Sequence, residues 1–131
     1  MNKKSGLLGI SGKTSDMREI QALRDAGDDR ARLAQEMYFY RLRKQIGAYA
    51  AAMGGVDIIV FTGGVGENKQ NAREAACEGL DFMGVKLDKK KNEEIRGEEA
   101  IISTPDSRVT VCVIPTDEEL MIALDTVSLV K

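Results

Sequence analysis

The stretch VDIIVFTGGVGENK, residues 56–69, decides the fold class of this 131-residue chain. Its first part, 56–61, is almost continuously apolar and mostly β-branched, which is typical of a central parallel strand buried on both faces. Glycines follow at once, and the residues from Asn71 to Gly79 have the pattern of a helix. The stretch therefore predicts a strand, a glycine turn and a helix, in that order.

The glycine turn, Gly63 to Asn68, is the first candidate binding site. It would lie at the carboxyl end of the strand, where open parallel sheets bind ligands. Glycines let backbone amides approach a ligand closely, and the next helix start offers N–H groups that attract anions. The turn matches neither the P-loop pattern nor the dinucleotide fingerprint. By spacing alone, a nucleotide-binding turn and a purely structural turn both stay open.

The amino-terminal segment predicts a loop followed by a short helix. Residues 6–15, GLLGISGKTS, contain three glycines and are expected to form the loop. Ser15 or Asp16 would cap the helix, and Asp16 with Glu19 has capping-box spacing. Gly27 would end it.

A longer helix is predicted from Asp28 to Met53, and the Gly54-Gly55 pair would end it. Apolar and aromatic residues recur in it at intervals of three or four, as on one helix face. The predicted buried face consists of Ala31, Ala34, Tyr38, Leu42, Ile46, Tyr49 and Met53.

The carboxy-terminal segment predicts further short elements. MGVKL, 83–87, and AIIS, 100–103, are β candidates on either side of a charged connection, 88–99, that reads as a solvated turn or a helical excursion. RVTVCVIP, 108–115, predicts a second apolar strand, and a helix with Thr116 as its cap should follow.

This order of elements predicts an α/β fold, with helices around two main parallel strands plus a short β-hairpin. Only two predicted strands are strongly apolar, and a two-stranded sheet is marginal by itself. We therefore expect an incomplete sheet whose other strands come from elsewhere.

A second candidate site is Thr116-Asp117-Glu118-Glu119, which follows the second strand. Acids belong at helix N-termini because of the helix dipole, which is the simpler interpretation. The alternative is a hard cation such as Mg²⁺, bound through one carboxylate and waters as in phosphate-transfer sites.

The third candidate, SGKTSDMR at 11–18, resembles a phosphate loop in composition only. No strand precedes it, and a P-loop ending at Thr14 would require glycine where Leu7 stands. Asp16 and Arg18 either contact a ligand or simply cap a helix and pair at the surface.

Composition limits the function classes. The 19 basic and 21 acidic residues give a net charge of -2 without a basic stripe, so we expect no nucleic-acid partner. Apolar runs such as Ile58 to Phe61 are far shorter than the ~20 residues that span a bilayer, so a cytoplasmic protein without membrane association is expected. Cys77 and Cys112 are expected to be buried free thiols. The chain contains no histidine, which excludes a histidine general base within it.

Several stretches, taken together, resemble the acetate kinase family. They are SGLLGISGKTSDMRE, YRLRKQIGAYAAAMGGVDIIVFTGGVGEN, GVKLD and RGEEAIISTPDSRVTVCVIPTDEELMIALDT, in family order and at family-like spacing. The resemblance covers essentially the whole chain. It implies an ATP-dependent phosphotransferase that interconverts acetate and acetyl phosphate, with an actin-like, ribonuclease H-like ATPase fold.

The resemblance also implies site residues. Residues 1–131 would be the carboxy-terminal nucleotide-binding portion, in which Asp16, Met17 and Arg18 contribute to the ATP/ADP site. The segment Gly64, Val65, Gly66, Glu67 and Asn68 would line the adenosine pocket. Glu118 would be the Mg²⁺-associated glutamate, and here Asp117 precedes it where the family pattern has asparagine.

The family's amino-terminal region would be absent, together with its phosphate loop, its acetate-pocket arginine and its catalytic aspartate. No catalytic residue is therefore expected in this chain, and the 131-residue fragment should be inactive alone. The alternatives are a non-catalytic nucleotide-binding or dimerisation module, consistent with a homodimer, and a truncated inactive gene product.

Overall fold

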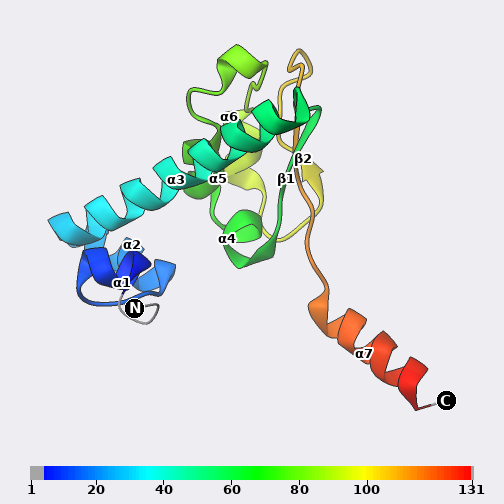
Figure 1. Ribbon diagram of the computed structural model, residues 1–131, viewed down its shortest axis with the longest axis horizontal. Coiled ribbons are helices and arrows are strands. Elements are labelled where there is room, and N and C mark those ends of the chain that lie inside the picture. The colour runs from blue at the N-terminus through cyan, green and yellow to red at the C-terminus, as the bar shows by residue number, and fades with distance from the viewer. Residues whose placement is uncertain (1–4, 131) are drawn as a thin grey trace. The chain divides into compact units, whose positions relative to one another are not determined.

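A computed structural model describes residues 5–130 of the chain (Figure 1). For Glu118 it describes the backbone but not the side chain. The chain divides into two compact units, Met1–Gly55 and Val56–Lys131. Each unit has its own buried residues and is described by itself.

The first unit consists of three helices, α1 (Gly6–Ser11), α2 (Met17–Asp25) and α3 (Asp29–Met53). The loop predicted for residues 6–15 is therefore wrong over 6–11. Leu7 and Ile10, one turn apart on α1, pack against a core of Ile20, Ala31 and Ala34. Burial of these apolar side chains offsets the poor helix propensity of the glycines.

Both predicted helix starts in this unit are confirmed. The Asp16 carboxylate accepts the Arg18 N–H at the start of α2, and the Asp28 carboxylate accepts the Ala31 N–H at the start of α3. Gly54 ends α3 in the left-handed conformation, with φ 75°, which a residue with a Cβ adopts only at a cost.

The predicted buried face of α3 is correct only in its first half. Ala31 and Ala34 are buried, but Tyr49 and Met53 are 60% and 67% exposed. Phe39 and Ala50 are buried instead, each one position beyond a predicted residue.

The second unit contains a three-stranded mixed sheet with helices around it. Its strands are β1 (Ile58–Phe61), β2 (Ala100–Ile101) and β3 (Thr110–Val113), in the order β1-β3-β2. β1 pairs with β3 in parallel, with Ile58 opposite Thr110, and β2 pairs with β3 in antiparallel. The predicted α/β class with two main parallel strands is confirmed, while the antiparallel strand pair forms between β2 and β3, and the β candidates at 83–87 and 100–103 share only an isolated bridge.

The helices of this unit are α4 (Gly63–Asn68), α5 (Gln70–Cys77), α6 (Lys89–Glu94) and α7 (Glu118–Leu129), with a 3-10 turn, η2, at Asp81–Met83. The predicted glycine turn is wrong, because residues 63–68 form a short helix. The charged connection contains α6, so the helical excursion is the correct alternative. The cap of α7 is Asp117, which accepts the Leu120 N–H, and not Thr116 as predicted.

The sheet also differs from expectation in where its strands lie. In the described sheet β3 is the central strand and β1 lies at an edge. Ile59 and Phe61 are buried, but Ile58 and Val60 are 57% and 46% exposed, so β1 is buried on one face only. The β candidate at 83–87 contributes isolated bridges, such as Val85 to Val109, in place of a regular strand.

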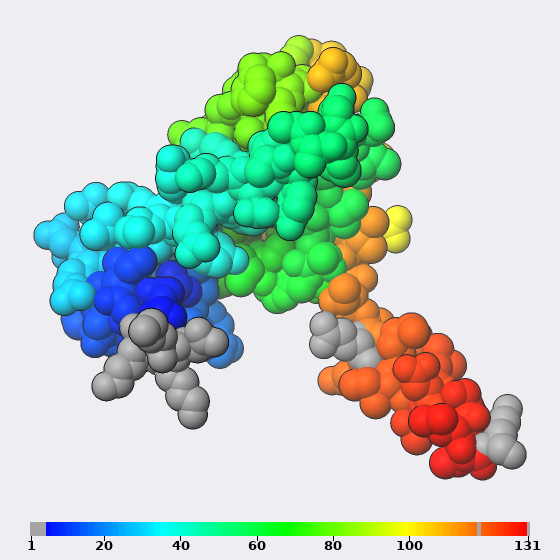
Figure 2. Space-filling model, viewed as in Figure 1, coloured from blue at the N-terminus to red at the C-terminus, as the bar shows by residue number. Residues whose placement is uncertain are grey.

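The core of the second unit contains residues from the strands of the sheet, from helix α5 and from the connections between them. Its buried apolar residues are Ile59, Phe61, Ala72, Ala76, Cys77, Leu80, Val85, Ile102, Val109, Val111 and Val113. Every described side chain of α7 beyond Glu118 is exposed, and Figure 2 shows this helix in orange to red. No helix in residues 5–130 is both long and apolar enough to cross a membrane.

Candidate functional site

The glycine helix α4 begins directly after β1, at the carboxyl end of that strand. Gly63 has φ +69°, which lets the chain turn sharply from the extended Thr62 into the helix. A Cβ on Gly66 would lie 3.1 Å from the backbone carbonyl carbon of Phe61, whereas a Cβ on Gly64 would meet nothing within 4 Å. Gly66 therefore lets α4 pack on the strand, while Gly64 leaves open space beside the helix.

Glu67 joins two strand ends. Its Oε1 accepts the Gly63 N–H at 2.8 Å, the Thr116 N–H at 2.9 Å and the Thr116 hydroxyl at 3.1 Å. The bond from the Thr116 N–H is the main cause that lowers the pKa of this carboxyl, and desolvation opposes it. The segments after β1 and after β3 are thus tied together. The Gly63 N–H donates to Glu67 and is therefore not free to bind an anion.

Arg73 holds the other end of α4. It lies on α5 with no exposed surface, and its guanidinium donates to the carbonyls of Gly66 at 2.9 Å and Glu67 at 2.8 Å. It also donates to Asn92 Oδ1 at 2.7 Å and to the Asn92 carbonyl at 2.8 Å. Desolvation lowers the pKa of Arg73. One buried cation thereby connects α4, α5 and α6.

Sequence reasoning missed Arg73, Asn92 and the tie between Glu67 and Thr116. One signal for Arg73 is present in the sequence, since it lies among Ala72, Ala76 and Cys77, the buried residues of α5. A charged residue on an apolar helix face is expected to have specific partners. Its partners are the Asn92 side chain and the main-chain carbonyls of Gly66, Glu67 and Asn92, and no local pattern identifies them.

Asp16, Met17 and Arg18 lie at the start of α2 in the first unit. Asp16 accepts the Arg18 N–H and also pairs with the Arg18 guanidinium at 2.7 Å. The hydrogen bond from that guanidinium is the main cause that lowers the pKa of Asp16 to about 2. Met17 packs against the core that contains Ile20. In this structure the polar pair makes the capping and surface pairing that the sequence left open.

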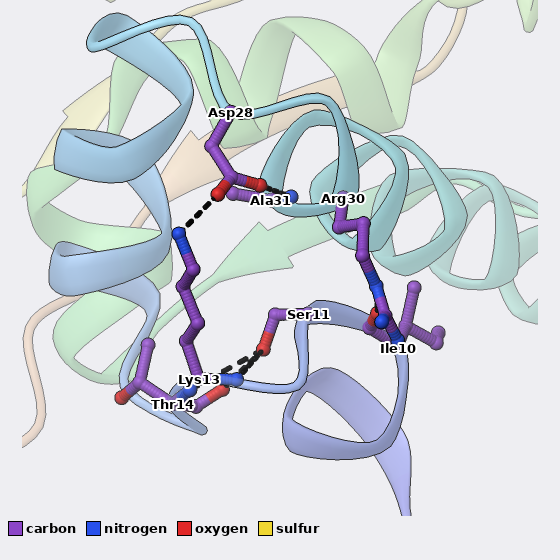
Figure 3. Close-up of polar contacts among 7 residues, drawn as sticks. All are labelled: Ile10, Ser11, Lys13, Thr14, Asp28, Arg30 and Ala31. Atoms are coloured by element: carbon purple, nitrogen blue, oxygen red, sulfur yellow. Dashed lines mark hydrogen bonds and ion pairs between the residues drawn. The ribbon is translucent and has the colours of Figure 1, made fainter.

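The loop before α2 is held by its own polar residues (Figure 3). The Ser11 hydroxyl donates to the Thr14 carbonyl at 3.0 Å and accepts the N–H groups of Lys13 and Thr14. Lys13 pairs with Asp28 at 2.5 Å. The Arg30 guanidinium donates to the Ile10 carbonyl at 2.9 Å, which ties the end of α1 to α3. Lys13 therefore has an internal partner, in agreement with the rejection of a P-loop here.

The residues that could hold a metal are few. The described residues contain no group of three or more histidine, cysteine, aspartate and glutamate side chains arranged for a metal ion. The Asp117 carboxylate caps α7 through the Leu120 N–H at 2.9 Å, and the side chain of Glu118 lies outside the described part. A single carboxylate at this position fits Mg²⁺, which commonly binds one or two carboxylates together with waters and substrate phosphates.

Comparison with known proteins identifies relatives over the whole chain. The model of the Acetokinase family matches residues 1–124. Acetate kinases from Phocaeicola vulgatus and Bacteroides thetaiotaomicron are 67% and 63% identical to this chain over 131 residues. These matches cover 100% of this chain and 33% of each relative, so the chain spans about a third of their length.

Solved structures agree with these matches. The acetate kinase of Porphyromonas gingivalis superposes with a TM-score of 0.89 at 58% identity, covering 99% of this chain and 33% of that one. The acetate kinase of Entamoeba histolytica gives a TM-score of 0.86 at 39% identity, covering 95% of this chain and 34% of that one. The two compact units described above thus have counterparts in proteins of the actin-like ATPase fold.

Proposed function

Because the chain belongs to the acetokinase family, we propose that it is the carboxy-terminal nucleotide-binding portion of an acetate kinase. The observation that carries this proposal is the match of residues 1–124 to the family, with 67% identity to the Phocaeicola vulgatus acetate kinase over the full chain. The proposed reaction is phosphoryl transfer between ATP and acetate, which yields ADP and acetyl phosphate.

In this proposal the chain positions the nucleotide. Gly64 to Asn68 line the adenosine side, where the open space beside Gly64 leaves room for a nucleoside to approach the main chain. Asp16, Met17 and Arg18 would also contribute to ATP/ADP binding. Glu118 would hold Mg²⁺, which neutralises phosphate charge when bound. None of these residues donates or accepts the transferred group, so the chain alone should not catalyse the reaction.

Reconstitution tests this proposal. The 131-residue chain would be mixed with the amino-terminal two-thirds of the Phocaeicola vulgatus acetate kinase, and acetyl phosphate would be trapped with hydroxylamine. We expect no activity from either part alone, ADP-Mg²⁺ binding by calorimetry, and activity from the mixture. Acetyl phosphate formed by the chain alone would contradict the division of roles. A chain that neither binds ADP nor reconstitutes would favour a truncated inactive product.

A second candidate function is a dimerisation module, in which two copies of this chain associate. The observation that favours it is β1, which has no strand partner on its outer side among residues 5–130 and exposes Ile58 and Val60. Exposed apolar edge strands are templates for pairing with another chain. This candidate does not exclude the first, because a homodimer could also bind nucleotide.

Light scattering after size exclusion tests the dimer. We expect the unaltered chain to elute as a dimer and the Val60→Lys variant as a monomer. Phe82→Lys is the matched control, since Phe82 is 81% exposed but lies on η2, away from the strand. A monomeric unaltered chain, or a dimer that Val60→Lys leaves intact, would contradict pairing through β1.

A further inference from the structure

We propose that Glu67 is a positioning residue that couples the glycine helix α4 to the segment leading into α7. This proposal rests on the proposed function, because it concerns the same nucleotide site. The family resemblance places Glu67 in the lining of the adenosine pocket. The geometry assigns its carboxylate a different task, which is to hold two parts of the site in register.

One oxygen of the Glu67 carboxylate is occupied within the protein. This oxygen, Oε1, accepts three hydrogen bonds, from the Gly63 N–H, the Thr116 N–H and the Thr116 hydroxyl, at 2.8 to 3.1 Å. Hydrogen bonds to an ionised carboxylate are about twice as strong as those between neutral groups. A nucleotide that used this oxygen would have to break the tie between the two strand ends.

The tie connects segments that are far apart in the sequence. Glu67 and Thr116 are separated by 49 residues. Thr116 directly precedes Asp117, which caps α7, and Glu118, the proposed Mg²⁺ carboxylate. Movement of Glu67 would therefore be passed to the backbone that carries Glu118.

The main chain of Glu67 is itself fixed. Its carbonyl accepts the Arg73 guanidinium at 2.8 Å and the Gly97 N–H at 3.2 Å. Arg73 is fully buried, so this anchor is not an adaptable surface contact. The side chain thus reaches Thr116 from a rigid base, which is what a positioning residue requires.

Amide hydrogen exchange on the purified 131-residue chain tests the tie directly. In Glu67→Ala we expect the Thr116 amide to exchange at least about tenfold faster, since the carboxylate oxygen that accepts this N–H is lost. Glu67→Gln keeps a carbonyl oxygen at this position and should restore much of the protection. Glu94→Ala, an exposed glutamate on α6, is the matched control and should leave Thr116 unchanged. Unchanged Thr116 exchange in Glu67→Ala would overturn the proposal.

Calorimetry with ADP then tests the coupling. In the unaltered chain Mg²⁺ should tighten ADP binding. In Glu67→Ala the ratio of the ADP dissociation constants without and with Mg²⁺ should be about tenfold smaller, and Glu67→Gln should partly restore it. A general structural loss would weaken ADP binding equally with and without Mg²⁺. An unchanged Mg²⁺ effect in Glu67→Ala would overturn the coupling. Failure of the unaltered chain to bind ADP would count against the proposed function, while the exchange experiment still decides the tie.

A variant on the other side of the tie covers the case in which Glu67→Ala does not fold. Thr116→Val removes the hydroxyl donor but keeps the backbone N–H and the shape of the side chain. We expect intermediate protection of the Gly63 amide and a partly reduced Mg²⁺ effect. Full protection together with a full Mg²⁺ effect would overturn the role assigned to this contact.

Discussion

Gly64 and Gly66 lie two positions apart in α4 and differ in their surroundings. A Cβ on Gly66 would lie 3.1 Å from the Phe61 backbone, so Gly66→Ala should destabilise the fold by about 1 to 3 kcal/mol. Gly64→Ala has open space and should leave stability unchanged or slightly raised. If the nucleotide approaches here, Gly64→Ala should weaken ADP binding about tenfold. Urea unfolding and calorimetry check both, and equal urea midpoints for the two variants would contradict the packing argument.

Asp16 provides a pH test at the same scale. The Arg18 guanidinium lowers the pKa of this carboxyl from 3.8 to about 2 in the folded chain. A lowered folded-state pKa means that the stabilisation is fully present above about pH 4 and is lost as the pH falls through about 2. The stability difference between the unaltered chain and Asp16→Asn should therefore be constant from about pH 7 to pH 4.5 and shrink below pH 4. Urea midpoints across this range measure it, and a difference that grows on acidification would contradict the assignment.

At the scale of elements, Arg73 is the connection between α4, α5 and α6. Removing its guanidinium would leave the carbonyls of Gly66, Glu67 and Asn92 without that donor in a buried region. We expect Arg73→Met to destabilise the chain by about 3 kcal/mol, because unpaired buried polar groups cost about 1 to 3 kcal/mol each. Lys89→Met, which removes an exposed ion pair to Glu74, is the control and should scarcely move the urea midpoint. Similar midpoints for the two variants would show that the buried connection is not a major source of stability.

At the scale of the whole molecule, the two units differ in the size of their cores. The first unit packs its helices around Ile20, Ala31 and Ala34, whereas the second buries a strand face as well as a helix face. Small cores give low local stability, so the first unit should open more readily. Native-state hydrogen exchange should find slower exchange at Val111 and Val113 of β3 than at Ile20 of α2. Equal protection in both units would mean that they unfold together.

Local patterns in the sequence predicted the features that depend on neighbouring residues. The cap at Asp16, the start of the long helix at 28–29 and its end at Gly54 were correct because each concerns bonds within one helix turn. The α/β class followed from the alternation of apolar runs with helical periods. The segment 6–11 was wrongly predicted to be a loop. Its contacts with Ile20 and Ala34 stabilise a helix that the intrinsic propensity of its glycines does not favour.

The sequence alone determined that this chain has the strands, helix starts and family motifs of an acetokinase segment, since these are written in short, ordered patterns. Only the tertiary structure decided that residues 63–68 form a helix against β1, and that the Glu67 carboxylate binds Thr116 in place of facing outward. It also decided that Arg73 is buried among carbonyls of two segments, 66–67 and 92–95. The physical reason is distance along the chain: Glu67 and Thr116, 49 residues apart, meet only when the sheet brings the ends of β1 and β3 together, and no local period in the sequence records that meeting.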